Sequence, residues 1–460
     1  MTIKLFEVGG SIRDELMGLE SADRDFCAVS PKGWESLLSW ANNKMLVFKV
    51  TPEFFTIRGS LGPDIIDIVM RNTRLPQSAQ GDLNGQLGAL DLGVKRMDEL
   101  LGEYGAETVH AALDALQDRA DALMRAELQE LPDGRWEATD YLDNDGITDE
   151  PLPITVALEI RGDTMTLDFE GTAPRCAGPV NIALPTAVAT AYVAIKHIFP
   201  NLPANSGVMR PINVMIPEGS LLSAPFPAPV GGYTETILRM IDVIFSAAAG
   251  AAPDRVVANA YGTINALSIS GKRENGQPWV MFSFYGGGHG GSVESDGLNH
   301  GNAPISTATI PPMEILEAAY PVMFKQWALR PDSAGAGMHR GGMGATYEIE
   351  VLEGGGAKAF LFGERGRHAP RGVVGGQSAA LNVFSYEQED GWHHPPMASK
   401  MVGIKLKQGQ SVRLDTPGGG GYGAPSEREP EAVARDVAAG FISAEQATKD
   451  YGPAWQEIRT

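Results

Sequence analysis

The chain has 460 residues, of which 43% are hydrophobic and 20% charged, so it is long enough for two or three domains with a large buried core. Its 55 glycines and 31 prolines indicate many turns and close backbone contacts, which favours a β-rich, loop-rich body over a mostly helical one. The formal charge of −20 would repel a phosphate backbone, so nucleic acid is a poor partner for the whole chain.

Cysteine usage and hydropathy predict a soluble, cytoplasmic protein. Cys27 and Cys176 are the two cysteines, and their wide separation fits reduced thiols rather than a disulfide scaffold. The start of the chain lacks the apolar core of a secretion signal, and nowhere do about 18 uncharged apolar residues follow one another. We therefore expect no membrane partner.

Residues 1–72 are predicted to form a small α/β unit that amounts to about half of a domain. Short apolar runs alternate there with turns and one amphipathic segment. The expected elements are strands at 5–8, 26–29, 46–50 and 65–69 and helices from Ser11 and over 34–41.

The rest of the chain is predicted to be a mixed body with a helical tail. Apolar residues at helical spacing predict helices over 82–103 and 106–130, whereas a period of two predicts a β-hairpin around Gly162. The hairpin strands are expected at 154–160 and 165–169, and further helices over 185–198, over 234–249, from Pro430 to Gly440 and after Ser443.

These elements predict an α+β fold, with a β-rich, glycine-rich body that contains helices and follows a truncated α/β unit. The expected boundaries are 1–72 for that unit, 73–424 for the body and 425–460 for the tail. No repeat of solenoid length is present, which excludes a repeat architecture.

A glycine turn and two spaced aspartates near the start form a pattern with chemical meaning. Gly9 and Gly10 follow the first expected strand, and their amides can approach a phosphate at the start of a helix. Asp23 and Asp25 lie two positions apart on the next strand, so they share one face and can hold Mg²⁺. Asp67, on a later strand, is placed to be a third metal ligand.

The order Gly-Gly-Ser-Ile-Arg13-Asp followed by Asp23-Arg-Asp25 resembles the head domain of the tRNA nucleotidyltransferase and poly(A) polymerase family. The resemblance implies a nucleotide site at Gly9, Gly10 and Arg13, with catalytic Mg²⁺ on the aspartates. The family's later motifs do not follow Asp67, so we expect a truncated head without turnover. The alternative is an ordinary turn followed by a solvated loop.

Several motifs follow one another in the chain after Arg74, and in this order they resemble the C-terminal two-thirds of hydantoinase B and 5-oxoprolinase subunits. They include Pro-Val-Gly-Gly before Glu235, Tyr-Gly-Gly-Gly before His289 and Gly-Glu364-Arg365-Gly. The segments that carry the resemblance are 81–86, 140–146, 168–181, 229–236, 284–288, 363–366, 416–423 and 426–443.

This second resemblance implies ATP-dependent opening of a small cyclic amide such as a hydantoin or 5-oxoproline, or carboxylation in some relatives. A hydantoinase A-type partner subunit would activate the substrate, and the B-type subunit would complete hydrolysis at a divalent metal. The sequence agrees in one respect, because it contains no Gly-x4-Gly-Lys-Ser/Thr phosphate loop. ATP is therefore expected on the partner.

The histidines offer little support for a metal site, because none forms a pair at a metal-ligand spacing. His289, within a glycine run, and His300, near Asp296, are the nearest to a loop-borne site, and His289 is a candidate catalytic residue. A polar loop held by tight turns is the alternative. His393 and His394 are neighbours on an extended chain, so their side chains should point apart.

Glu364 and Arg365 are the other candidate catalytic residues, as a charged pair at a site, although a structural salt bridge or loop anchor is the favoured interpretation. The glycine runs 286–288 and 418–421 can present amides to an anion, but close packing of strands is favoured for them.

The region before Arg74 departs from the hydantoinase B pattern, because the family's His-His-x-Asp-x-Gly-Gly metal motif does not occur. We therefore expect the catalytic metal site to be missing and the chain to be inactive alone. Since half a sheet leaves an uncovered core, the join near 71–74 is interpreted as chimeric. The open hypotheses are a cyclic amide hydrolase subunit, a nucleotidyltransferase and a non-catalytic scaffold subunit.

Overall fold

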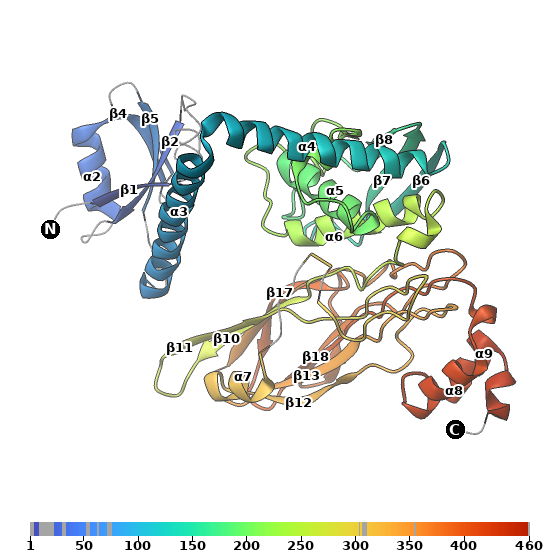
Figure 1. Ribbon diagram of the computed structural model, residues 1–460. Helices are drawn as coiled ribbons and strands as arrows, with labels where there is room; N and C mark the ends of the chain where they lie inside the picture. Colours follow the sequence, from blue (N-terminus) through green and yellow to red (C-terminus); the bar gives the residue numbers. More distant parts are fainter. Residues whose placement is uncertain are drawn as a thin grey trace. The chain divides into compact units, whose positions relative to one another are not determined.

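The computed structural model describes nine stretches of the chain and divides the chain into two compact units, Met1–Ala112 and Leu113–Thr460. Figure 1 gives the labels of the helices and strands. The described residues are 4–8, 23–29, 34–51, 56–61, 64–70, 76–302, 304–305, 311–353 and 356–458.

The first unit contains a five-stranded sheet with the order β1-β2-β5-β4-β3. The pair β2 and β5 is parallel and the other neighbours are antiparallel. Its elements are β1 (Lys4–Val8), β2 (Asp23–Val29), α2 (Trp34–Lys44), β3 (Leu46–Thr51), β4 (Thr56–Leu61) and β5 (Asp64–Met70).

The strands predicted in this unit are confirmed, and β4 is an addition to them. The sequence of β4, Thr-Ile-Arg-Gly-Ser-Leu, contains a glycine and only two apolar residues, so its own pattern is weak. Pairing with β3 and β5 on its two sides supplies the hydrogen bonds that make it a strand. Gly9, Gly10, Arg13 and the helix predicted from Ser11 lie outside the described residues.

Two long helices follow, as predicted: α3 (Pro76–Tyr104) and α4 (Ala106–Gln129). Gly105 separates them in the left-handed region, with φ of +78°. Ala120, Met124 and Leu128 recur at helical spacing and enter the hydrophobic core of the second unit.

The first half of the second unit is a four-stranded sheet packed against helices, with the order β6-β7-β8-β9. The hairpin predicted around Gly162, which has φ of +58°, is confirmed, as are α5 and α6. These elements are β6 (Gly134–Leu142), β7 (Leu152–Arg161), β8 (Thr164–Asp168), α5 (Leu184–Ile198), β9 (Ile212–Met215) and α6 (Tyr233–Ala248).

The second half is a pair of antiparallel sheets, β11-β10-β14-β17 and β12-β13-β18-β15-β16, whose inner faces share one core. Leu267 and Leu361 from one sheet and Ile349 and Leu414 from the other are buried in it. The elements are β10 (Ala266–Lys272), β11 (Pro278–Ser283), α7 (Met313–Ala319), β12 (Val322–Leu329), β13 (Ala345–Val351), β14 (Ala357–Phe362), β15 (Val383–Gln388), β16 (Gly391–His393), β17 (Lys400–Leu406) and β18 (Ser411–Asp415).

Glycine runs from distant parts of the chain pack directly against one another beside these sheets. The amide of Gly288 donates to Pro417 (3.0 Å), and that of Gly419 donates to Gly342 (3.0 Å). A Cβ on Gly419 would overlap the carbonyl of His289. These amides are therefore committed to protein carbonyls, which confirms close packing as the role of these glycines.

The tail contains the two predicted helices, α8 (Pro430–Ala438) and α9 (Ala444–Tyr451). Ser443 caps α9 by accepting a hydrogen bond from the Gln446 amide at 3.2 Å. Short 3₁₀ helices occur at Ser206–Met209, Pro253–Arg255, Pro425–Glu427 and Ala454–Glu457. Within the described ranges, no helix has the length and apolar character needed to cross a membrane. The mixed α+β class is thus as predicted.

Candidate functional site

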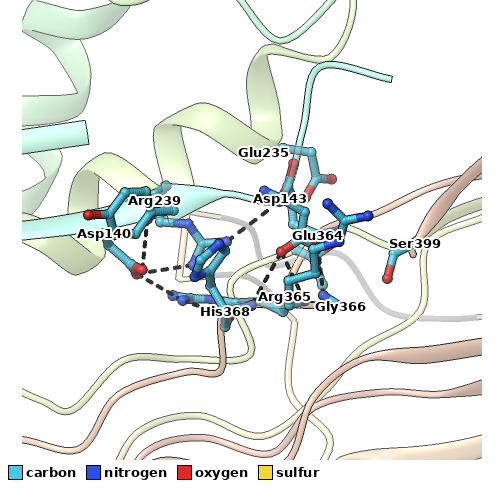
Figure 2. A network of polar contacts seen from close by, with 12 residues as sticks. Asp140, Asp143, Glu235, Arg239, Glu364, Arg365, Gly366, His368 and Ser399 are labelled. Atoms are coloured by element: carbon cyan, nitrogen blue, oxygen red, sulfur yellow. Dashed lines mark hydrogen bonds and ion pairs between the residues drawn. The ribbon is translucent and has the colours of Figure 1, made fainter. Parts of the chain in front are cut away.

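Eight charged side chains form a buried network in the second unit, and none of them is more than 4% exposed (Figure 2). Burying so many charges is costly unless each is paired, so the contacts of each residue matter. The members are Asp140, Asp143, Glu235, Arg239, Asp242, Glu364, Arg365 and Lys400.

Three members come from one face of α6. Glu235, Arg239 and Asp242 follow one another at spacings of four and three, which places them on the same side of a helix. The remaining residues of α6 are mostly apolar and buried. The helix therefore carries one charged stripe into an otherwise hydrophobic core.

Arg365 links the strand β6 to α6. Its Nη1 donates to Oδ2 of Asp140 at 2.8 Å and its Nη2 donates to Oδ2 of Asp242 at 2.5 Å. Arg239 Nη1 shares the same oxygen of Asp140 at 3.3 Å. Arg365 adopts φ of +66°, a conformation that costs free energy in a residue with a side chain and that this pairing compensates.

Glu364 makes its contacts with other residues. Its carboxylate accepts a hydrogen bond from Lys400 Nζ and another, at 2.7 Å, from the amide of Asp143. Arg239 Nη2 lies 4.0 Å from it. Glu364 and Arg365 are thus both buried in ion pairs, but with different partners.

The carboxylate of Asp143 organises the loop that follows Arg365. It accepts hydrogen bonds from the consecutive amides of Gly366 (2.6 Å), Arg367 (3.0 Å) and His368 (3.3 Å). A carboxylate that accepts hydrogen bonds from several consecutive amides fixes the positions of those amides. The loop backbone is therefore fixed from within the core.

The network holds more acids than bases, five carboxyl groups against three cations. Burial, reinforced by the nearby Glu364, raises the pKa of Glu235 to about 7. Its Oε1 accepts from the amide of Ile264 at 3.0 Å, whereas Oε2 has no hydrogen-bond partner among the described residues. Burial also raises the pKa of Asp242 and of Glu364, but those two carboxylates have cationic partners, whereas Glu235 has no ion pair among the described residues.

Comparison with known proteins assigns the chain to a family. The family model for hydantoinase B/oxoprolinase matches residues 49–425. The chain belongs to this family. The match begins before Arg74, so similarity to the hydantoinase B family extends into the segment 49–72, which was predicted from the sequence to belong to the preceding unit.

Individual relatives agree with the family match. An uncharacterized protein of Methanocaldococcus jannaschii is 33% identical, with 87% of this chain and 69% of the relative covered. Caprolactamase subunit beta of Pseudomonas jessenii is 31% identical over 88% of this chain and 71% of the relative. A crystal structure of the ATP-dependent caprolactamase from Pseudomonas jessenii gives a TM-score of 0.73 at 29% identity, covering 83% of this chain and 67% of that chain.

The other candidate catalytic residue of this hydantoinase B family member, His289, lies among the packed glycines. Its Nε2 bonds to the carbonyl of Asn302, its ring is tilted against Tyr261, and burial lowers its pKa. His300 instead contacts the Tyr347 hydroxyl.

Asp296, His393 and His394, also considered as metal ligands, each contact a different partner. Asp296, near His300 in sequence, pairs with Arg428 at 2.6 and 2.8 Å. His393 contacts Asp390 at 2.7 Å and His394 contacts the carbonyl of Phe384 at 2.9 Å, so these neighbours point apart as predicted.

A divalent metal, which the family implies, does not fit the donor sets that the structure describes. No group of three or more His, Cys, Asp or Glu side chains is arranged to hold a metal ion among the residues searched. Three of the five buried carboxylates, those of Asp140, Asp242 and Glu364, are instead paired with Arg239, Arg365 and Lys400. We therefore assign no chemical step of this chain to a metal.

The aspartates predicted as Mg²⁺ ligands lie on neighbouring strands. The register of the parallel pair β2 and β5 sets Asp25 opposite Asp67 and Asp23 opposite Ile65. Their side chains lie outside the described part of the structure. The backbone thus brings Asp25 and Asp67 together, and the Mg²⁺ site itself stays a prediction.

Several members of the network were not predicted from the sequence. Arg239 and Asp242 had a signal that can be recognised in retrospect, because charges spaced by three and four residues interrupt an apolar helix. Lys400 had no such signal, since it lies at the start of β17 without a motif of its own.

Proposed function

We propose that the chain is a B-type subunit that acts in ATP-dependent hydrolysis of a cyclic amide. The observation that carries the proposal is the family match over 49–425. It is supported by the likeness to caprolactamase subunit beta and to the structure of an ATP-dependent caprolactamase, whose name denotes a cyclic amide substrate. The substrate would be a small ring such as a hydantoin, 5-oxoproline or a lactam.

A hydantoinase A-type subunit is the proposed partner, and it would bind ATP. Two features support an ATP-binding partner. The relative from Pseudomonas jessenii is named as a subunit, caprolactamase subunit beta, and the present sequence lacks a phosphate loop of the Gly-x4-Gly-Lys-Ser/Thr type. We further propose that the chain does not turn over substrate by itself, because the described residues supply no donor set for the metal that the family implies.

The buried network would act on the reaction indirectly. Glu364 and Arg365 are both 0% exposed, so neither can touch a substrate in this conformation. Their contacts fix the loop 364–371 through Asp143 and Asp140. We assign them the role of positioning residues for that loop.

The proposal is tested with the full chain and a co-expressed A-type subunit, supplied with ATP, a divalent metal salt and a panel of hydantoin, 5-oxoproline and caprolactam. Ring opening that needs both subunits supports the proposal. Co-purification without turnover on any ring would favour the scaffold hypothesis instead. Lys407→Gln serves as a control variant and should leave ring opening unchanged, because the Lys407 side chain is 71% exposed and is not part of the buried network.

Nucleotidyl transfer by the first unit is a second proposal, favoured by the register that sets Asp25 opposite Asp67. A pair of carboxylates on adjacent strands is a suitable Mg²⁺ site. The assay is incorporation of labelled CTP or ATP into tRNA, and loss of incorporation in Asp25→Asn would support the proposal. No incorporation by the intact chain would contradict this second proposal and would fit a truncated head without turnover.

A further inference from the structure

The loop 364–371 is fixed from the inside and displays polar side chains on the outside. Besides the three amides bound by Asp143, the carbonyls of His368 and Ala369 both accept from Arg365 Nη1 at 3.3 Å. The amide of Arg371 donates to Asn259 Oδ1 at 3.2 Å. Because these contacts hold the loop backbone, the outward side chains keep their positions without needing contacts of their own.

His368 is the outward residue with unused hydrogen-bonding capacity. Its ring stacks on Tyr141, with centroids 4.9 Å apart and an angle of 25° between the planes. The ring nitrogens make no hydrogen bond to any residue that the structure describes. Partial burial lowers the pKa of His368 although Asp143 opposes the shift, so the imidazole is neutral near pH 7.

Arg371 is the neighbouring cation. Its side chain is 43% exposed, Nη1 donates to the carbonyl of Thr139 at 2.7 Å, and Nη2 lies 3.9 Å from Asp140. Asp140 is already bound by Arg365 at 2.8 Å, so it compensates the Arg371 charge only weakly. Arg367, by contrast, has its own partner in Asp149 at 2.8 Å.

The two side chains are held on the same stretch of β6. Thr139, which anchors Arg371, and Tyr141, which supports the His368 ring, are two positions apart on this strand. The charge of Arg371 also acts on His368, since it is one of the causes that lower the pKa of that imidazole. The site therefore combines a neutral imidazole and a partly uncompensated guanidinium on one rigid support.

The energetics favour a binding role over a purely structural one. Replacing a buried ion network with well-packed apolar residues is often neutral or stabilising, so stability alone does not call for eight buried charges. Here the network fixes a loop whose outer side chains, His368 and Arg371, have few protein partners. Functional side chains commonly lie on loops that a rigid scaffold positions.

We propose that His368 and Arg371 form a binding site for a small carboxylate ligand. The inference rests on the proposed function, because opening a cyclic amide produces an amino acid with a new carboxylate. Arg371 would bind the carboxylate through its guanidinium. His368 would donate one hydrogen bond to, or accept one from, a polar group of the ligand that lies beside the carboxylate.

The test is NMR of the full chain labelled with ring-¹³C histidine, in which eight histidines give few signals and His368→Gln assigns the signal of interest. The probes are L-glutamate, 5-oxoproline and the uncharged lactam 2-piperidone. We expect saturable shifts of the His368 signal with the two carboxylates and none with 2-piperidone. Arg371→Gln should weaken glutamate binding about tenfold or more, the effect of losing one charge-assisted contact.

Arg135→Gln is the matched control, because Arg135 is also on β6 and its side chain is 48% exposed. It should leave the glutamate titration unchanged. An unmoved His368 signal, a non-saturable shift, or equal affinity in Arg371→Gln would each overturn the site. Because no turnover is measured, these results are independent of the ring-opening assay, and either proposal can fail alone.

Discussion

Arg365 and Asp140 are 225 residues apart in the sequence, yet Arg365 Nη1 donates to Asp140 Oδ2 at 2.8 Å inside the protein. The pair joins the loop after β14 to the strand β6, and Asp242 adds α6 to the same contact. The Arg365 guanidinium thus connects three elements: the loop after β14, the strand β6 and the helix α6.

Arg365→Met should destabilise the protein strongly. The substitution keeps much of the side-chain volume but leaves Asp140 and Asp242 buried without their main cation, which typically costs about 3–5 kcal/mol. Urea denaturation measures the change. Arg135→Met, at an exposed position, should stay within about 0.5 kcal/mol of the parent protein, and a similar small effect for Arg365→Met would contradict the account.

Glu364 and Lys400 should behave as a coupled pair. Glu364→Gln leaves the Lys400 ammonium without its counter-charge, and Lys400→Met leaves a buried carboxylate, so each single change should destabilise. The double variant should be more stable than the sum of the two effects predicts, with a coupling of about 1–3 kcal/mol. A double-mutant cycle measures this directly. Additive effects would show that the two groups do not interact energetically.

Glu235 should make stability depend on pH. Burial and the nearby Glu364 raise its pKa from the ordinary 4.5 to about 7. Between these values the folded protein holds the proton and the unfolded chain has lost it. The free energy of unfolding should therefore fall as pH rises from about 4.5 to about 7, by on the order of 3 kcal/mol from this group.

Glu235→Gln should remove that part of the pH dependence, because an amide does not titrate in this range. Unfolding of the variant and the parent protein at several pH values measures the difference. Glu137→Gln is the control, since the Glu137 side chain is 64% exposed on β6. If the slope between pH 4.5 and 7 is the same in Glu235→Gln as in the parent, Glu235 does not carry the proton.

Gly419→Ala should be poorly tolerated. A Cβ at this position would overlap the carbonyl of His289, which is itself held by the amide of Gly342. We expect a loss of about 3 kcal/mol or more, since neither chain can move without breaking other backbone hydrogen bonds. Gly231→Ala, where nothing lies within 4 Å of the added carbon, should be nearly neutral. Thermal unfolding of both variants tests the comparison.

Much of the fold was predictable because local periodicity decides it. The helices α4 and α6 and the hairpin at Gly162 follow from apolar spacing that no tertiary contact overrides. Strand β4 was missed because its pairing with β3 and β5, rather than its own pattern, makes it a strand. Motifs revealed Glu364 and Arg365 as notable residues.

The partners of Glu364 and Arg365 could not be predicted in the same way. Lys400 and Asp242 reach them only through the tertiary fold, across long stretches of sequence. A charged residue looks the same in sequence whether it is solvated or buried in a network, so the role of Glu364 as a buried acid emerged only from its surroundings.

The most direct test of the central claim is the yield of ring-opened amino acid measured against ADP formed, with this chain, an A-type subunit and ATP together. The account predicts stoichiometric ring opening that disappears when either subunit or ATP is omitted. Ring opening by this chain alone without ATP, or hydrolysis of ATP by the complex with no cyclic amide opened, would contradict it.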